Sequence, residues 1–486
     1  MAKPVGLPGG GCKRRCRIAA EQTHLFIGVI TLPMVYGGVS AALLRKHGVR
    51  VGDRISFKAR DGTFEGIVMP RSELGDEHHL VLKLANGYNI GVYVGGKEKL
   101  EVACGGSGTG KMPVRELAPK KGKPLLSIIH TGGTIASKVD YRTGGVLPAL
   151  KVAELIELFP ELGRMANLRA TVVSNVLSED IEPEHCALMA KQIGREIAAG
   201  AQGIVITHGT DTLAVSSAML SFMAQTLPVP VVFVGSQRSS DRGSSDADMN
   251  LMCAANFALN ADFAGVTLCM HGTTSDDYCF IHEGTKVRKM HASRRDAFRS
   301  VNQKPWARVW RDGRIEFLRE DRLGRDPSRK PILCERFEKK VALLKIYSGF
   351  DPELLNFFTE NKYEGLVLES TGLGNMPVSD LDGATRKHKQ TLQNLKRFID
   401  SGGIAVMTSQ CIYGRVNMNV YSTGRDLLKI GVLPGSDMLP ETALVKLRWV
   451  LGQTSDAEKA RAMMLTNIAG EITERTGTDA VIEQEL

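Results

Sequence analysis

Residues 125–134 read LLSIIHTGGT: a run of apolar, partly β-branched residues stops at a histidine and is followed by two threonines around a glycine pair. A short apolar run that ends at glycines is typical of a buried strand in a parallel sheet. Open α/β sheets bind their ligands at the carboxyl ends of such strands. The stretch therefore predicts an α/β fold with threonine hydroxyls and glycine amides at the ligand-binding edge.

The same pattern recurs along the chain. Strand-like runs end in small or polar residues at ATVVSNV (170–176), GIVITHGT (203–210), VPVVFVGS (229–236) and GVTLCMHG (265–272), and helix-period stretches lie between them. Three more runs follow at VALLKIY (341–347), GLVLEST (365–371) and GIAVMTS (403–409). Strands alternating with helices indicate parallel sheets covered on both faces. We expect two such domains, over residues 125–325 and 330–486.

A different pattern precedes them. Residues 49–72 and 79–94 alternate apolar and polar side chains, with turn signals at Asp61-Gly62 and Asn86-Gly87. This predicts a small all-β domain over residues 48–102, a five-stranded SH3-like barrel. The Gly- and Pro-rich residues 103–124 are expected to form a linker.

Composition restricts the function only broadly. The 486 residues are 43% hydrophobic and 24% charged, as in a soluble globular protein, and the net charge of +9 permits a polyanionic partner such as nucleic acid. The nine cysteines are scattered without zinc-site spacing, so we expect reduced thiols and no metal site.

The N-terminal residues 1–47 form an extension with more than one interpretation. Residues 25–44 carry no charge and follow the basic CKRRCR, which resembles a signal sequence or a short membrane anchor. Pro33 and the pair Gly37-Gly38 argue against this, and Met34 offers an alternative start. We expect a cytoplasmic protein that does not enter a membrane.

Three strand ends carry the chemically useful groups. They are residues 131–134, 207–212 and 235–238, which together supply hydroxyls, one carboxylate and glycine amides. A threonine hydroxyl becomes a nucleophile only when a base removes its proton and donors stabilise the oxyanion. Asp211 beside Thr210 is placed to orient such a base, and the glycine amides are placed to form an oxyanion hole.

The motifs HTGGTIAS (130–137) and ITHGTDTL (206–213) resemble the two signatures of the bacterial-type L-asparaginases, which deamidate Asn or Gln with a threonine nucleophile. The resemblance implies that Thr134 is the nucleophile and Thr210 the second catalytic threonine. It makes Asp211 the residue that holds the substrate's α-amino group. Tyr141, in KVDYRTGG, falls where the family has the tyrosine of a mobile lid.

The resemblance extends to a lysine and to a substrate-binding segment. In GTKVRKMHASRRDAF (284–298), Lys289 precedes Phe298 at the family's spacing, so it would help Asp211 to deprotonate Thr210; Lys286 is the alternative. VLSEDIE (176–182) resembles the family's Gly-Ser-Gln segment, which implies substrate-binding roles for Ser178 and Glu179. Glu179 replaces the family's glutamine.

Three features depart from asparaginases: the β domain, the segment GSQRSSDRGSSDADMNL (235–251) and the segment 409–452. All three resemble the D subunits of archaeal glutamyl-tRNA(Gln) amidotransferases, over residues 43–486. Proteins of that family hydrolyse glutamine to glutamate and ammonia without a cofactor. A partner E subunit binds Glu-tRNA(Gln), activates it with ATP and Mg²⁺ and receives the ammonia, in a heteromer with a homodimeric D core.

Two other classes of function are weighed against this one. A stand-alone L-asparaginase or glutaminase would be favoured by the apolar N-terminus. A non-catalytic scaffold for RNA or protein is disfavoured, because the set Thr134, Thr210, Asp211 and Lys289 is intact.

Overall fold

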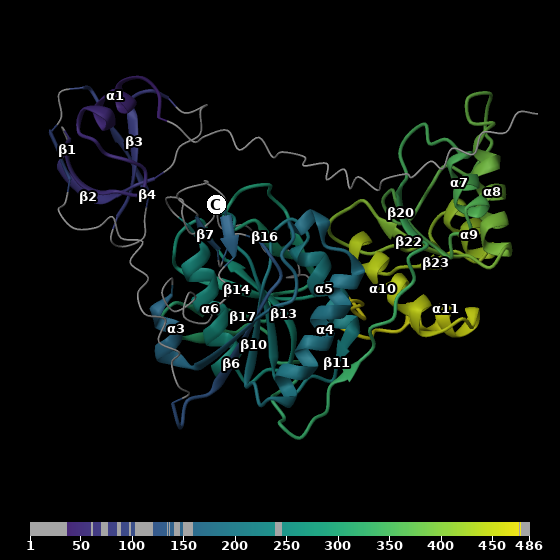
Figure 1. Ribbon diagram of the computed structural model, residues 1–486. Coiled ribbons are helices and arrows are strands. Elements are labelled where there is room, and N and C mark those ends of the chain that lie inside the picture. The colour runs from purple at the N-terminus through teal and green to yellow at the C-terminus, as the bar shows by residue number, and fades with distance from the viewer. Residues whose placement is uncertain are drawn as a thin grey trace, which may run out of the picture.

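Figure 1 shows the computed structural model of the chain, in which a small β domain precedes two α/β units. The residues that the structure describes are 36–59, 62–69, 76–84, 89–96, 99–102, 120–133, 135, 137–139, 146–148, 159–238, 245–475 and 477. Residues 1–35 of the predicted extension and residues 103–119 of the predicted linker lie outside the described part.

The β domain contains five strands in one antiparallel sheet, as the alternating sequence predicts. The order is β4-β3-β2-β1-β5, and the strands are β1 Arg54–Ala59, β2 Gly62–Val68, β3 His79–Lys83, β4 Asn89–Tyr93 and β5 Lys99–Val102. Helix α1, Gly38–Lys46, begins before the predicted boundary at residue 48 and packs Leu43 and Leu44 into the same core as Ile55 and Phe57. The apolar character of residues 36–44 is thus accounted for by packing within this domain.

The first α/β unit is built on an eight-stranded sheet. The order is β18-β17-β14-β13-β12-β10-β6-β9. Five strands are parallel, as predicted: β6 Leu125–His130, β9 Asn167–Val172, β10 Gly203–Thr207, β12 Pro230–Val234 and β13 Gly265–His271. Three more extend the sheet in the antiparallel sense: β14 Tyr278–Glu283, β17 Ala307–Trp310 and β18 Ile315–Phe317.

Helices cover both faces of this sheet, which explains why strands β10 and β12 are buried at every position. On strand β10, Ile204 and Ile206 face the core made with α4 and α5, whereas Val205 faces the core made with α6. The helices are α3 Pro160–Met165, α4 Pro183–Ala198, α5 Leu213–Met223 and α6 Ala247–Asn260. Short strand pairs complete the unit: β7 Ser137–Val139 with β8 Val146–Pro148, β15 Val287–Lys289 with β16 Phe298–Ser300, and β11 Ala224–Gln225 with β19 Ile332–Leu333.

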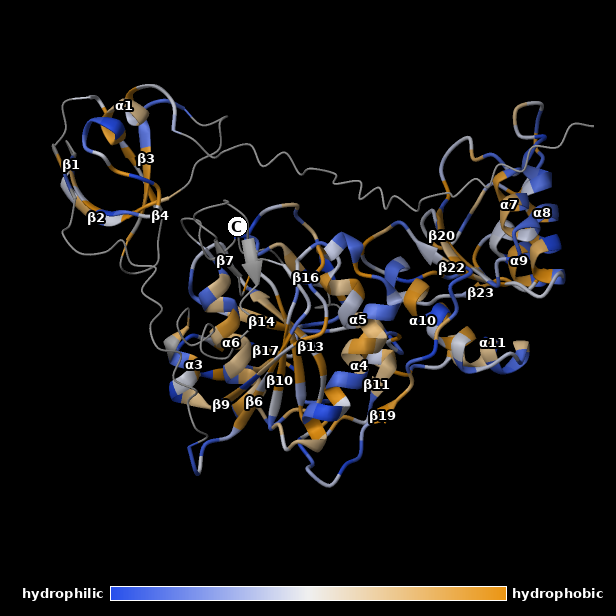
Figure 2. Cartoon of the chain, in the orientation of Figure 1, coloured by the Kyte–Doolittle hydropathy of each residue, from blue (hydrophilic) through white to orange (hydrophobic). Residues whose placement is uncertain are grey.

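The second unit has a four-stranded parallel sheet, β20-β21-β22-β23. Its strands are β20 Val341–Lys345, β21 Gly365–Ser370, β22 Ile404–Ser409 and β23 Leu433–Pro434, and its helices are α7 Leu354–Glu360, α8 His388–Asp400, α9 Ser422–Lys429, α10 Pro440–Gln453 and α11 Ala457–Leu465. Figure 2 shows hydrophobic residues along the central strands and a mixture of hydrophilic and hydrophobic residues around α8.

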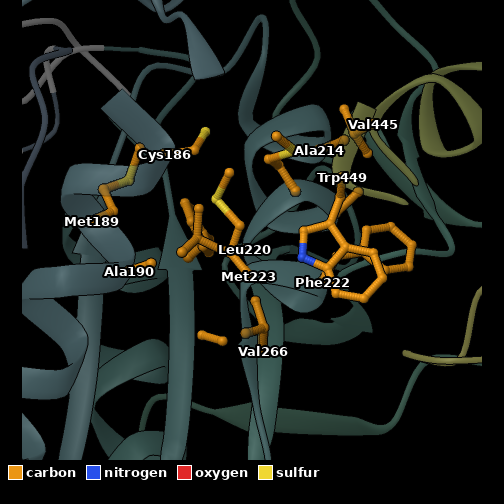
Figure 3. Packing of buried hydrophobic residues seen from close by; sticks show 14 of the residues in the cluster. Cys186, Met189, Ala190, Ala214, Leu220, Phe222, Met223, Val266, Val445 and Trp449 are labelled. Carbon is orange, nitrogen blue, oxygen red and sulfur yellow. The ribbon is translucent and has the colours of Figure 1, made fainter. Parts of the chain in front are cut away.

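One hydrophobic core joins the two α/β units. Figure 3 shows Phe222 of α5 beside Trp449 of α10. The two rings are stacked, with their centroids 5.9 Å apart. Helix α5 is buried almost all round because it lies between the sheet and α10, and a helix in that position has no polar face.

Within the described residues, none of the helices combines the length and the apolar character needed to span a membrane.

Candidate functional site

The loops that follow strands β6, β10 and β12 meet at one edge of the sheet, as the sequence predicts. A β-carbon added at Gly133 would lie 2.7 Å from the amide nitrogen of Gly209, and one added at Gly235 would lie 2.9 Å from Cγ2 of Thr210. Such distances are shorter than van der Waals contact, so these loops approach as closely as they do only because glycines occupy these positions. Gly133 also has a φ of 78°, a backbone conformation that favours glycine.

At this edge, Thr210 lies within hydrogen-bond distance of Lys289. The Lys289 Nζ is 2.9 Å from the Thr210 Oγ1 and 2.8 Å from the Asp211 Oδ1. The Lys289 side chain is 14% exposed and that of Asp211 is 64% exposed, so the group opens to solvent on the Asp211 side. A lysine held between a hydroxyl and a carboxylate is placed to exchange a proton with the hydroxyl.

Lys289 reaches this site from the short hairpin β15–β16 and not from a parallel strand. The alternative lysine, Lys286, is fully buried and donates to the Asp437 Oδ2 at 2.7 Å, away from Thr210. Of the two lysines, Lys289 is therefore the one that contacts Thr210.

The predicted substrate-binding segment also reaches the site. The Asp211 amide donates to the Ser178 Oγ at 3.3 Å, and the Thr212 Oγ1 donates to the Ser178 carbonyl. Ser178 is buried and its hydroxyl lies 3.4 Å from the Glu179 Oε2, whereas Glu179 itself is exposed. The structure thus brings together Ser178, Glu179, Thr210, Asp211 and Lys289.

Two predicted site residues, Thr134 and Tyr141, lie outside the described residues. The described neighbours Gly132 and Gly133 fix where the segment leaves β6. A β-carbon at Gly132, whose φ is 118°, would lie 2.0 Å from the Val176 carbonyl oxygen. Gly132 and Gly133 therefore lie between the Val176 backbone, just before the Ser178 segment, and the Gly209 loop.

Two residues that hold the third loop were missed in the sequence. The buried Asp246 accepts the amides of Gln237 and Arg238 at 3.0 and 2.9 Å, and Asn250 donates to the Gly235 carbonyl at 3.0 Å. Asp246 also accepts from the Asn250 side chain at 2.9 Å. The sequence contained a signal for Asp246, because this residue immediately precedes α6 and a carboxylate at the start of a helix is suited to bind loop amides.

Two buried histidines, His130 and His208, lie at the carboxyl ends of β6 and β10, and a third, His282, lies within β14. Burial lowers the pKa of His130 and of His208 to about 4. Burial, and secondarily the Arg299 charge, lowers the pKa of His282 to about 3. In the described residues, the Nε2 atoms of all three rings lack a hydrogen-bond partner, which is consistent with neutral imidazoles.

These shifts predict how stability depends on pH. Between pH 6.5 and pH 4 the unfolded histidines bind protons that the folded ones do not, so the free energy of unfolding should fall as pH falls, by about 1.4 kcal/mol per pH unit for each histidine. Urea unfolding at pH 7, 6 and 5 measures this. His282→Gln should make the dependence shallower, whereas His388→Gln, on a half-buried residue of α8, should not. An unchanged dependence in His282→Gln would contradict the assignment.

In the part of the chain that the structure describes, His, Cys, Asp and Glu side chains form no group of three that could hold a metal ion.

The chain matches three known protein families. Residues 125–323 match the family described as Asparaginase, N-terminal, and residues 340–464 match the Glutaminase/Asparaginase C-terminal domain. Residues 49–103 match the GatD N-terminal domain. Among solved structures, the thermostable L-asparaginase from Thermococcus kodakarensis superposes with a TM-score of 0.63 and 32% identity, over 72% of this chain and 100% of that one. L-asparaginase I from Vibrio cholerae superposes with a TM-score of 0.61 and 28% identity, over 72% and 99%.

The relatives in sequence cover almost the whole chain. The D subunit of the glutamyl-tRNA(Gln) amidotransferase of Thermococcus kodakarensis is 48% identical over 444 residues, which are 90% of this chain and 98% of that protein. Its counterpart from Pyrococcus furiosus is 49% identical over 438 residues, 89% and 97%. The shared domains and this coverage lead to one assignment: the chain belongs to the family of glutamyl-tRNA(Gln) amidotransferase D subunits.

Proposed function

We propose that this chain is the glutamine-hydrolysing component of a tRNA-dependent amidotransferase and supplies ammonia for the conversion of Glu-tRNA(Gln) to Gln-tRNA(Gln). The observation that carries the proposal is the contact of Lys289 with both Thr210 and Asp211 at the carboxyl end of β10. In a member of the D-subunit family, that contact supports amide hydrolysis rather than a purely structural role.

The proposed reaction has two steps. The Thr134 hydroxyl attacks the side-chain amide carbon of glutamine, the C–N bond breaks, and ammonia leaves with the proton that the hydroxyl loses. Water then hydrolyses the threonyl ester and releases glutamate. Lys289 and Asp211 help to deprotonate Thr210, and Thr210 in turn takes the proton of the attacking water.

The substrate is held by the groups around this centre. The Asp211 carboxylate, largely exposed and adjacent to Thr210, binds the α-amino group of glutamine. Ser178 and Glu179 lie on the other side of the Asp211 amide and complete the binding of the substrate's polar end. Tyr141 closes over the bound substrate and excludes water.

The remaining steps belong to a partner. An E subunit binds Glu-tRNA(Gln), uses ATP and Mg²⁺ to activate the glutamate and accepts the ammonia, while this chain uses no cofactor. The D subunits form a homodimeric core in a cytoplasmic heteromer. The relatives named as subunits of an amidotransferase support a multi-subunit assembly.

A stand-alone L-asparaginase or glutaminase is the second candidate. The observation that favours it is the match to all of the Thermococcus kodakarensis L-asparaginase chain, which places a complete asparaginase-like body within this chain. The β domain at residues 49–103, which matches the GatD N-terminal domain, weighs against it.

The two candidates predict different assay results. Ammonia release from glutamine is measured for the purified chain alone, then with a candidate E subunit, and then with the E subunit and Glu-tRNA(Gln). We expect low activity from the chain alone and a rise of at least about tenfold when partner and charged tRNA are both present. Full activity from the isolated chain, unchanged by either addition, would identify a stand-alone amidohydrolase. Uncharged tRNA is the matched control.

A further inference from the structure

Lys286, three residues before Lys289, joins the two α/β units. It lies directly before β15, and its Nζ donates to the side chain of Asp437 at 2.7 Å and to the Asp437 carbonyl at 3.1 Å. Asp437 belongs to the second unit, between β23 and α10. Both side chains are 0% exposed. The ion pair therefore connects the base of the hairpin that carries Lys289 to the interior of the other unit.

The other strand of the hairpin is attached at the same place. Asn302, just after β16, donates to the Asp437 carbonyl at 3.1 Å and to the Gly414 carbonyl at 3.0 Å, and it accepts the Gly414 amide at 2.8 Å. Its φ of 63° lies in the left-handed region, which turns the chain toward this contact. The Val301 amide donates to the Lys286 carbonyl at 2.8 Å, so the two attachments are linked across the hairpin.

Asp437 is held in turn by the end of the second unit. The Thr473 amide donates to the Asp437 Oδ1 at 3.0 Å, and the Thr473 hydroxyl donates to its Oδ2. Burial opposes ionisation of Asp437, but the charge and hydrogen bond of Lys286 hold the pKa of its carboxyl below the usual range. The carboxylate is thus a charged, fixed acceptor at neutral pH.

The hairpin needs such an attachment. Strands β15 and β16 pair only with each other, over three residues each, and form a two-stranded sheet separate from the main one. An isolated two-stranded hairpin is marginally stable in water, so its position depends on what it packs against. Val287 and Phe298 pack into the hydrophobic core, and the contacts at the two ends of the hairpin add polar attachments to the second unit. A third link, the Arg288–Glu441 ion pair at 3.3 Å, points to the same unit.

We propose that Lys286, Asp437 and Asn302 are positioning residues that hold the β15–β16 hairpin so that the Lys289 amine reaches Thr210 and Asp211. This inference rests on the proposed glutaminase function. The second α/β unit then does more than bury a hydrophobic face: it sets the distance between the catalytic lysine and its hydroxyl partner. A shift of about 1 Å in a reacting group is enough to lower a rate as much as 10²-fold.

The test is Asp437→Asn in the full chain assembled with its partner and Glu-tRNA(Gln). The amide keeps the shape of the side chain but removes the charge that holds Lys286. We expect kcat for glutamine hydrolysis to fall about 10- to 100-fold. KM for glutamine should change less than about threefold, because the substrate-binding groups Ser178 and Asp211 lie on other loops.

The matched control is Glu196→Gln, the same carboxylate-to-amide change at another buried site. Glu196 lies on α4 and binds Arg169, Thr171 and Gln192, far along the chain from the hairpin. It should lose stability but keep kcat within about twofold when rates are normalised to the folded fraction. A wild-type kcat in Asp437→Asn at equal folded fraction overturns the proposal.

Two further variants keep the test decisive. If Asp437→Asn does not fold, Thr473→Val removes a neutral hydroxyl that donates to Asp437 and accepts from Arg415 Nη2 at 3.1 Å, while the Thr473 amide and carbonyl keep their own contacts with Asp437 and Arg415. This variant should lower kcat about threefold with KM unchanged. An unchanged kcat there overturns the proposal. Lys289→Met in the same assay separates the proposed glutaminase function from the proposed positioning role of Lys286, Asp437 and Asn302. The proposed function itself fails if the wild-type protein does not hydrolyse glutamine, or if Lys289→Met is fully active. If Lys289→Met loses activity but Asp437→Asn is fully active, only the positioning role is refuted.

Discussion

Replacement of Lys289 by methionine is expected to lower kcat for glutamine hydrolysis by about 10²- to 10⁴-fold, the usual contribution of a positioned acid–base group. Methionine keeps the length of the side chain but removes the amine that contacts the Thr210 Oγ1 at 2.9 Å and the Asp211 Oδ1 at 2.8 Å. Ammonia release under saturating glutamine, in the presence of the partner and Glu-tRNA(Gln), measures the effect.

The same variant should fold normally. The Asp211 partner of the ion pair is 64% exposed, so its carboxylate stays solvated when the amine is removed. An ion pair of this kind contributes about 0–1 kcal/mol to stability. Lys345→Met, which removes an exposed lysine paired with Glu369 on the second unit's sheet, is the matched control and should keep full activity. A Lys289→Met protein with a wild-type kcat would show that Lys289 takes no part in proton transfer.

The sequence predicted the position of the site because the physics that places it is local. Apolar β-branched runs form the parallel strands, and the residues that follow them must meet at the carboxyl edge, so Thr210 and the loop containing Ser236 were expected there. Lys289 did not follow from that reasoning. It comes from a hairpin whose two strands have only three residues each, too short for a recognisable alternation, and it was identified through its spacing from Phe298 in the asparaginase-like motif.

The long-range contacts could not be predicted. Lys286 and Asp437 are 151 residues apart and belong to different units, and a lysine in a basic run gives no sign that it is fully buried. Strands β14, β17 and β18 were missed for a related reason. Their antiparallel pairing extends a parallel sheet, and two of them have only three or four residues, so neither a helix-separated repeat nor a clear period marks them. Tertiary packing, not local propensity, decides these elements.

Thr210→Val is expected to reduce kcat/KM for glutamine by a similar factor, about 10²- to 10⁴-fold. Valine retains the branched shape, so the close approach of the Gly235 loop to the Thr210 Cγ2 is preserved and only the hydroxyl is lost. Thr391→Val is the matched control, because the Thr391 hydroxyl on α8 is buried without a hydrogen-bond partner among the described residues and lies in the other unit. Its activity should equal that of wild type.

The double variant Thr210→Val/Lys289→Met tests whether the two residues act as one unit. If Lys289 works through the Thr210 hydroxyl, removing either group disables the same proton path, and the double variant should lose little more than the worse single variant. If the two residues act independently, the reductions in rate of the two single variants should multiply in the double variant. Two reductions of about 10²-fold each would then give about 10⁴-fold or more. Multiplied losses would mean that the 2.9 Å contact between Lys289 and Thr210 does not carry the proton, and that Lys289 acts on the substrate or on Asp211 alone. Non-additive losses would require the amine and the hydroxyl to be in contact during the reaction, which is the geometry that the β15–β16 hairpin and its attachment to Asp437 maintain.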